Sequence, residues 1–138
     1  MTKKHKNLQR KIKECYREGY EVLSEKYLPN GSKHWYRPDV ILRNKKDNEI
    51  AHIYEIEGDP VRKALAGAII LADCCLAELN QKSKPILTFV VYAEKGKQQI
   101  GDFKKRVSIL KKRCQCLRKI NVKDEKELRQ ELSDTSSR

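Results

Sequence analysis

The chain has 138 residues, a formal net charge of +12, and 38% hydrophobic against 36% charged residues. That length fits one domain with a modest core, so we expect a single domain over residues 1–132 and a frayed tail over 133–138. No stretch reaches the roughly 18 apolar residues that a membrane-spanning helix needs, and residues 1–7 contain no signal-peptide-like apolar run. The composition predicts a cytoplasmic protein that does not bind membranes.

The first half of the chain predicts one helix and then three strands. Residues 4–18 carry apolar side chains at helical spacing. Residues 20–28 fit either a strand or more helix, and the Tyr-x-Val opening favours the strand. Residues 39–43 and 50–57 are rich in β-forming residues and flank the polar segment 44–49, which predicts a β-hairpin.

The second half predicts helices alternating with strands. Asp59 and Pro60 suit the N-cap and first position of a helix that runs to Leu79, and its apolar surface predicts burial on more than one side. The run Ile86–Ala93 is typical of a central strand covered on both faces. A basic helix over residues 99–117, a short strand over 120–122 and a helix from the Asp124 cap to Leu132 are expected to follow. This order predicts an α/β fold with a mixed central β-sheet flanked by helices.

Positive charge is concentrated in the last third of the chain. Residues 95–138 contain 14 basic and 6 acidic residues, and the segment Lys95–Lys119 contains ten basic residues against the single acid Asp102. Such a field attracts polyanions, so we expect a nucleic acid as partner, with DNA favoured. The five cysteines include no Cys-x-x-Cys pair and lie far in sequence from the histidines, which favours reduced, packed thiols over a zinc site.

The predicted hairpin brings three acidic residues together. A turn centred on Asp47 pairs residues whose numbers sum to about 94, so Asn44 faces Ile50 and Asp39 faces Glu55. Glu57 shares the face of Glu55, because side chains alternate along a strand. Like charges at such spacing are destabilising, and a raised pKa, a cationic side chain or a bound metal must offset them.

A magnesium or manganese ion is the neutralising partner that suits oxygen ligands best. Asp39 and Glu55 are the predicted metal ligands, with the carbonyl of Ile56 as the third. The ion would polarise a phosphoryl oxygen and help to generate hydroxide. The competing interpretation is that the acids pair with Arg37, Arg43 or Lys63 and do nothing more, and a one-residue register slip would destroy the cluster.

The segments Arg37-Pro38-Asp39 and Glu55-Ile56-Glu57 resemble the Pro-Asp and Asp/Glu-x-Lys motifs of the PD-(D/E)xK phosphodiesterase superfamily, which has the restriction-endonuclease-like fold. The two acids are 16 positions apart, and the expected element order matches the αβββαβ core of that superfamily over roughly residues 5–93. The resemblance implies that Asp39 and Glu55 bind Mg²⁺ or Mn²⁺ and that water cuts a nucleic-acid strand.

The chain departs from this motif at Glu57, where the family usually has lysine. Some restriction-type members carry glutamate there, as base or second metal ligand. Lys63 is the best substitute lysine, with Arg62 beside it. His5 and Glu14 are lesser candidates to complete the site from the first helix.

Several basic and aromatic residues are predicted to hold the nucleic acid. The segment 34–37 (His-Trp-Tyr-Arg) precedes Asp39 and is as consistent with base stacking or phosphate binding as with capping the core. Two basic triplets lie seven residues apart in the last predicted long helix and are expected on similar faces. The predicted contacts are Arg37, Arg62, Lys104, Lys105, Arg106, Lys111, Lys112 and Arg113.

The sequence thus predicts a magnesium-dependent endonuclease. The alternative is a catalytically inactive nucleic-acid-binding module of the same fold, with the acids neutralised by Lys63 or Arg62. A small structural protein is the third and weakest interpretation. The apolar bulk of Ala64–Leu79 exceeds what a small sheet face needs, which suggests a homodimer. The form of the substrate and its sequence preference are left open.

Overall fold

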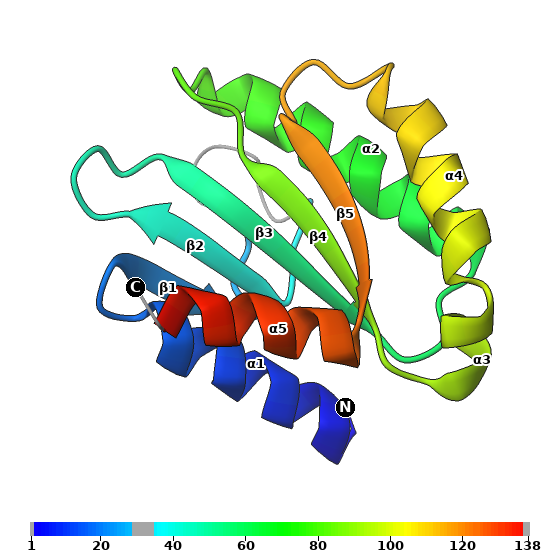
Figure 1. The fold of residues 1–138 in the computed structure, drawn as a ribbon. Coiled ribbons are helices and arrows are strands. Elements are labelled where there is room, and N and C mark those ends of the chain that lie inside the picture. The colour runs from blue at the N-terminus through cyan, green and yellow to red at the C-terminus, as the bar shows by residue number, and fades with distance from the viewer. Residues whose placement is uncertain (1, 29–34, 137–138) are drawn as a thin grey trace.

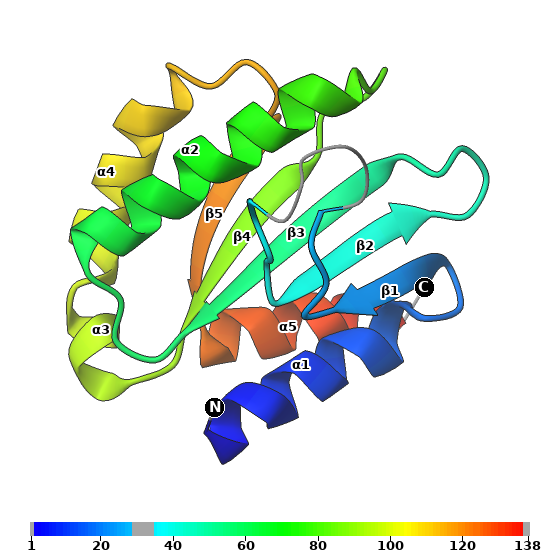
Figure 2. The same cartoon turned by 180° about the vertical axis from the view of Figure 1, so that it is seen from behind.

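A five-stranded mixed β-sheet with helices on both faces forms the protein, as Figures 1 and 2 show from opposite sides. The computed structural model describes residues 2–28 and 35–136, and all statements on structure concern that part of the chain. The predicted α/β class is confirmed. The elements are α1 (Lys3–Tyr16), β1 (Tyr20–Ser24), β2 (Val40–Asn44), β3 (Ile50–Glu57), α2 (Arg62–Leu79), β4 (Ile86–Val91), α3 (Glu94–Gln98), α4 (Ile100–Lys111), β5 (Lys119–Asp124) and α5 (Glu125–Ser136).

The strands lie in the sheet in their order along the chain, from β1 to β5. The pairs β1–β2 and β2–β3 are antiparallel, whereas β3–β4 and β4–β5 are parallel. Parallel neighbours need crossover connections of one hand, and two such crossovers in the same direction place α2 and α4 on the same face. Helices α1 and α5 cover the other face (Figures 1 and 2).

The hairpin register agrees with the prediction near the acidic end and departs from it near the turn. Ile41 pairs with Ile53 as expected. A β-bulge between Leu42 and Arg43 then shifts the ladder, so Ile50 pairs with Arg43 and not with Asn44. A bulge opposes two residues to one, which is why the predicted sum holds only on one side of it.

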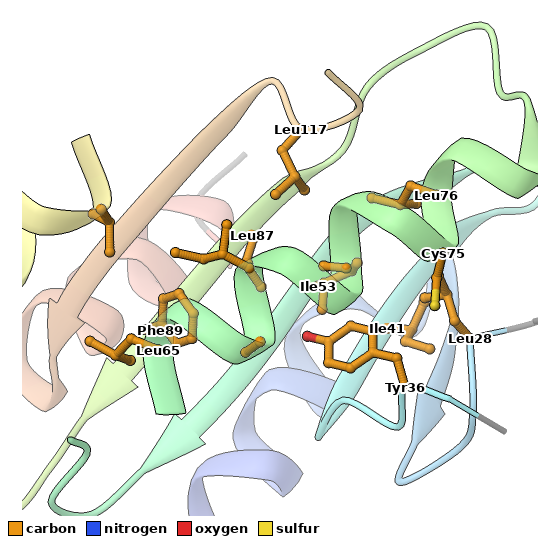
Figure 3. Close-up of a cluster of buried hydrophobic side chains, with 14 of the residues drawn as sticks. Leu28, Tyr36, Ile41, Ile53, Leu65, Cys75, Leu76, Leu87, Phe89 and Leu117 are labelled. Atoms are coloured by element: carbon orange, nitrogen blue, oxygen red, sulfur yellow. The ribbon is translucent and has the colours of Figure 1, made fainter. Parts of the chain in front are cut away.

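Each face of the sheet has its own hydrophobic cluster. Under α2 and α4, Ile41 and Ile53 pack with Leu65, Phe89 and further residues, several of which Figure 3 shows. Under α1 and α5 the cluster comprises Leu8, Ile12, Val40, Leu42, Tyr54, Ile56, Val90, Leu128 and Leu132. The predicted alternation along β2 and β3 is therefore confirmed.

Helix α2 differs from its prediction at its start and in its burial. It begins at Arg62 with Val61 as N-cap, so Asp59 and Pro60 are not its cap and first residue. The carbonyl of Gly58 accepts the N–H of Ala93, which holds the chain beside the end of β4 and delays the helix. Only one side is buried: Ile70 and Leu71 are exposed.

The basic helix is shorter than predicted, and the final helix is longer. Helix α4 ends at Lys111, because the carboxylate of Asp73 accepts the N–H groups of Gln115 and Cys116 and so holds the following turn out of helical geometry. Asp124 caps α5 as predicted, through reciprocal hydrogen bonds with Glu127. Helix α5 continues to Ser136, so residues 133–136 are not frayed, and residues 137–138 lie outside the described part.

No helix in the described ranges is long and apolar enough to cross a membrane.

Candidate functional site

The three predicted acids meet at one end of the sheet. Asp39 immediately precedes β2, and Glu55 and Glu57 lie in the last part of β3. Because β2 and β3 are antiparallel, the beginning of one strand lies beside the end of the other. The connection from β3 to α2 starts at this same end, as Figure 2 shows.

Asp39 is fixed by hydrogen bonds from four directions. Its backbone N–H donates to Oε1 of Glu55 at 3.2 Å, and its Oδ2 accepts the N–H of Ile56 at 2.6 Å. Its carbonyl oxygen accepts Nε2 of Gln9 at 3.1 Å and the N–H of Glu25 at 3.0 Å. The side chain of Asp39 is therefore held against β3 at Ile56, the residue between the two glutamates.

Helix α1 contributes a histidine to the acids. His5 Nε2 lies 3.0 Å from Oδ1 of Asp39. The hydroxyl of Thr2 caps α1 by accepting the N–H of His5, so the ring is presented from the first turn of the helix. Glu14, the other residue considered on this helix, is exposed and faces Arg10 at 3.8 Å; no hydrogen bond links it to the acids in the described residues.

The three carboxyl groups have raised pKa values. Burial is the largest cause for each. Burial and the charges of Asp39 and Glu57 raise the pKa of Glu55 to about 8. Burial and the charge of Asp39 also raise the pKa of Glu57. Each shift favours the protonated, neutral carboxyl, and the contacts that oppose it at Asp39 are the Ile56 N–H and the His5 ring.

Tyr36 adds a polar group that lacks a regular partner. Its side chain is buried in the cluster under α2 (Figure 3), and its hydroxyl lies beside the carboxyl of Glu55. That hydroxyl makes no hydrogen bond of regular geometry within the described residues. A buried hydroxyl without a well-formed hydrogen bond is costly, and the carboxyl of Glu55 is the polar group beside it.

The basic residues that would neutralise the acids are engaged elsewhere or exposed. Arg37 lies 3.6 Å from Glu25, Arg43 pairs with Glu21, and Arg62 lies 3.3 Å from Asp102. Lys63 is exposed in the first turn of α2, and within residues 2–28 and 35–136 no hydrogen bond or ion pair joins it to a carboxylate. The interpretation in which arginine partners silence the acids is therefore not the arrangement found.

The donor set suits a hard divalent cation, although the present geometry does not enclose one. Carboxylate oxygens of Asp39 and Glu55 and a backbone carbonyl such as that of Ile56 are the ligand types that Mg²⁺ and Mn²⁺ take. In the described chain no three acidic, histidine or cysteine side chains are arranged as a ready-made metal site. Both oxygens of Asp39 already have protein partners, so a cation would compete with His5 or with the N–H of Ile56.

Only part of the second basic triplet lies in the same helix as the first. Lys104, Lys105 and Arg106 are exposed on α4, where Lys104 pairs with Glu127 at 3.5 Å and Arg106 with Asp102 at 3.0 Å. Lys111 is the last residue of α4, and Lys112 and Arg113 lie beyond the helix. The expected similar face therefore holds for Lys104 and Lys111, which line one groove, and Lys112 and Arg113 follow the end of the helix.

The aromatic residues before Asp39 differ in exposure, so one suits base stacking and the other caps the core. Trp35 is 60% exposed, whereas Tyr36 is buried in the core. His34 lies outside the described residues. The exposed indole is available for stacking, and the buried phenol supports the acids.

The sequence analysis did not consider Gln9, and it considered Tyr36 only within the segment 34–37 and not as a neighbour of Glu55. Gln9 is buried, although glutamine is usually exposed, and it lies four residues after His5 on the same helix face. A glutamine beside the apolar stripe of Leu8 and Ile12 was the signal that could have identified it. For Tyr36 the only signal was its position three residues before Asp39.

Comparisons with known proteins assign no function, so a functional assignment depends on the acids and the fold that positions them. No protein-family model matches the chain, and neither a curated protein nor a solved structure matches it. The restriction-endonuclease-like resemblance therefore rests on the Asp39, Glu55 and Glu57 pattern and on the order of elements around it.

Proposed function

We propose that this protein is a metal-dependent nuclease that hydrolyses phosphodiester bonds, with DNA as the favoured substrate. The observation that carries the proposal is the convergence of Asp39, Glu55 and Glu57 at one end of the sheet with raised pKa values and without a lysine or arginine partner in the described residues. Titratable groups shifted in this way cluster at functional sites.

In this proposal Asp39 and Glu55 hold Mg²⁺ or Mn²⁺, with the carbonyl of Ile56 as the third protein ligand. When bound, the ion withdraws electron density from the scissile phosphate and lowers the pKa of water. Gln9 and Glu25 fix the backbone of Asp39 through its carbonyl oxygen. They thereby set the direction in which the carboxylate points.

Glu57 takes the position of the usual family lysine and is the available base. Burial and the charge of Asp39 raise its pKa, and a carboxylate with a raised pKa is a better proton acceptor near neutral pH. Lys63, exposed in the first turn of α2, supplies positive charge beside the same end of the sheet. Its role is to attract the phosphate and not to position the acids.

Cleavage assays with isosteric variants test this proposal. Labelled plasmid, branched DNA, single-stranded DNA and RNA are incubated with Mg²⁺ or Mn²⁺, and product is followed over time. Asp39→Asn and Glu55→Gln are expected to lower the rate by at least about a hundredfold, because each removes a charged ligand or its electrostatic effect. Glu78→Gln, which changes an exposed acid on α2, is the matched control and should cleave like the wild type.

A lack of cleavage on every substrate with both metals, or equal rates in the wild type and both site variants, would reject the nuclease. Equal rates would also reveal a contaminating enzyme.

One observation favours a second function, a catalytically inactive nucleic-acid-binding module. The raised pKa of Glu55 to about 8 means that this carboxyl is largely protonated at neutral pH when no cation is bound. With Glu55 protonated, the acids are stable without a cation and need not be catalytically active. This alternative predicts salt-sensitive DNA binding that Mg²⁺, Mn²⁺ and Ca²⁺ do not change.

Homodimer formation through α2 stays a prediction. Ile70 is 58% and Leu71 38% exposed on the outer side of this helix, and a second copy would cover them. Light scattering at micromolar concentration measures the mass. A monomeric mass would reject the dimer without affecting the proposed chemistry.

A further inference from the structure

A basic groove runs along the outer edge of β5. It has a volume of about 420 Å³ and is lined by α4 residues such as Lys104 and Lys111, by residues 118–123 and by Glu127. Figure 1 shows α4 beside β5 on one face of the sheet and α5 on the other. The ion pair between Lys104 and Glu127, 3.5 Å long, joins these two helices across the groove.

Three of the cations in this groove have no acidic partner among the residues that the structure describes. Lys104 pairs with Glu127, and Lys123 pairs with Glu131 at 2.6 Å. Lys111, Arg118 and Lys119 form no ion pair with any acid of the described chain. Unneutralised cations grouped in a concave surface concentrate the electrostatic field, which attracts anions.

The last residue of β5 lies in the same transverse row as Glu57, whereas Arg118 and Lys119 lie at the other end of this strand. Glu57 of β3 pairs with Val91 of β4, and Val91 pairs with Asp124 at the end of β5. With neighbouring strands about 4.8 Å apart, Glu57 and Asp124 lie in one transverse row roughly 10 Å apart. A chain that follows β5 from Arg118 to Asp124 would therefore emerge near the candidate centre.

We propose that this groove binds the sugar–phosphate backbone of a single nucleic-acid strand that flanks the bond to be cut. The proposal rests on the nuclease function above and adds a substrate-holding surface outside the acidic centre. Lys111, Arg118 and Lys119 contact phosphates. The polar side chains of Ser108 and Asn121 and the free edge of β5 supply further hydrogen-bonding groups.

The dimensions favour one strand over a duplex. Clefts of about 300–1,000 Å³ hold molecules of drug size, so this groove takes only a short stretch of a single backbone. An acidic peptide that adds to β5 as a sixth strand would use the same edge. The surplus of unpaired cations and the alignment with the acids favour the nucleic acid.

Fluorescence anisotropy with a labelled single-stranded DNA tests the groove in EDTA, where no cleavage takes place. We compare the wild type with the double variant Arg118→Ala and Lys119→Ala between about 50 mM and 200 mM salt. For a single strand, the slope of log K against log salt changes by about 0.7 for each phosphate that the protein no longer neutralises, so it should become shallower by about 1.4. The affinity at the lowest salt should fall by about tenfold or more.

The control removes the same charge elsewhere. Lys13 lies on the exposed side of α1 and Lys46 in the turn between β2 and β3, and both are exposed. The double variant Lys13→Ala and Lys46→Ala should keep the wild-type slope and bind within about twofold of the wild type. Circular dichroism of both double variants checks that the fold is intact.

Equal losses of affinity in the two double variants would overturn the proposal, because they would reflect net charge alone. Displacement of the DNA by duplex but not by unlabelled single strand would overturn it as well. Displacement by polyglutamate that depends on Arg118 and Lys119, together with an unchanged DNA slope, would assign the groove to an acidic peptide.

Failure of the proposed nuclease function would give a different result, namely DNA binding through the groove without cleavage. Cleavage that survives the groove variants with unchanged KM would reject the groove and leave the nuclease intact.

Discussion

The backbone N–H of Asp39 donates a hydrogen bond to Oε1 of Glu55 at 3.2 Å, so the main chain, and not a cationic side chain, joins the two acids. One N–H satisfies one oxygen only in part. Burial and the charges of Asp39 and Glu57 outweigh it, and the pKa of Glu55 rises to about 8. Without a cation, this arrangement makes protein stability depend on pH.

Glu55→Gln should stabilise the metal-free protein at alkaline pH. Between the ordinary pKa of 4.5 and about 8, the folded state holds a proton on Glu55 that the unfolded state has lost. The free energy of unfolding therefore falls as pH rises through that window, by about 1.4 kcal/mol for each pKa unit. Urea unfolding in EDTA should give equal stability near about pH 5. Near about pH 9 the variant should be more stable by a few kcal/mol. A gain that is the same at both pH values would contradict this origin.

Divalent cations should raise the melting temperature of the wild type. A ligand that binds only the folded state at a hundred times its Kd stabilises it by about 2.7 kcal/mol. Because protons compete for the same carboxylates, the effect should grow as pH rises toward 8. Differential scanning calorimetry with Mn²⁺ or Mg²⁺ measures it. Asp39→Asn should abolish the shift, and Glu78→Gln should retain it; a shift preserved in Asp39→Asn would place the metal elsewhere.

Two tyrosine hydroxyls should differ in their contribution to stability. The Tyr54 hydroxyl donates to Oε2 of Glu131 at 2.5 Å, whereas the Tyr36 hydroxyl lacks a hydrogen bond of regular geometry. A hydrogen bond to a charged group contributes about 1.5–3 kcal/mol. Tyr54→Phe should lose about that amount in urea unfolding, whereas Tyr36→Phe in EDTA should be at least as stable as the wild type, because it removes a buried hydroxyl without a regular partner. Similar losses in both variants would show that Tyr36 has a full partner.

His52 should make the protein less stable as pH falls. Its ring stacks on Tyr54 with centroids 4.1 Å apart, and its Nε2 lies 2.8 Å from the hydroxyl of Thr88. Burial lowers the pKa of His52 from 6.5 to about 4. Between these values the unfolded state binds a proton that the folded state refuses, so stability falls as pH decreases from about 6.5 to 4. In His52→Gln the part of this pH dependence that comes from His52 should vanish. A difference between variant and wild type that stays constant with pH would refute it.

The fold was predictable where the pattern along one segment decides the structure. Alternation in residues 39–43 and 50–57 placed Ile41 opposite Ile53, and the structure confirms this pair and the convergence of the acids at one end of the hairpin. The bulge at Leu42 and Arg43 was not predictable, because nothing in a local pattern marks where an extra residue enters a ladder.

Long-range contacts decided the features that local patterns do not encode. Helix α4 stops at Lys111 because Asp73, more than forty residues before Cys116, binds the turn that follows. Gln9 and His5 reach Asp39 only after α1 packs on the sheet. The acids themselves were recognisable from their spacing. Their contact with α1 depends on tertiary packing.

Helix α1 is held in place by the last helix of the chain. Lys4 pairs with Glu125 at 2.8 Å, and the Tyr16 hydroxyl donates to Glu131 at 2.7 Å. One end of α1 thus carries His5 toward Asp39, while both ends are anchored to α5. Truncating the protein before Glu125 would consequently disturb the acidic centre without removing any residue that touches it. The C-terminal helix thus supports the position of His5 through its contacts with α1.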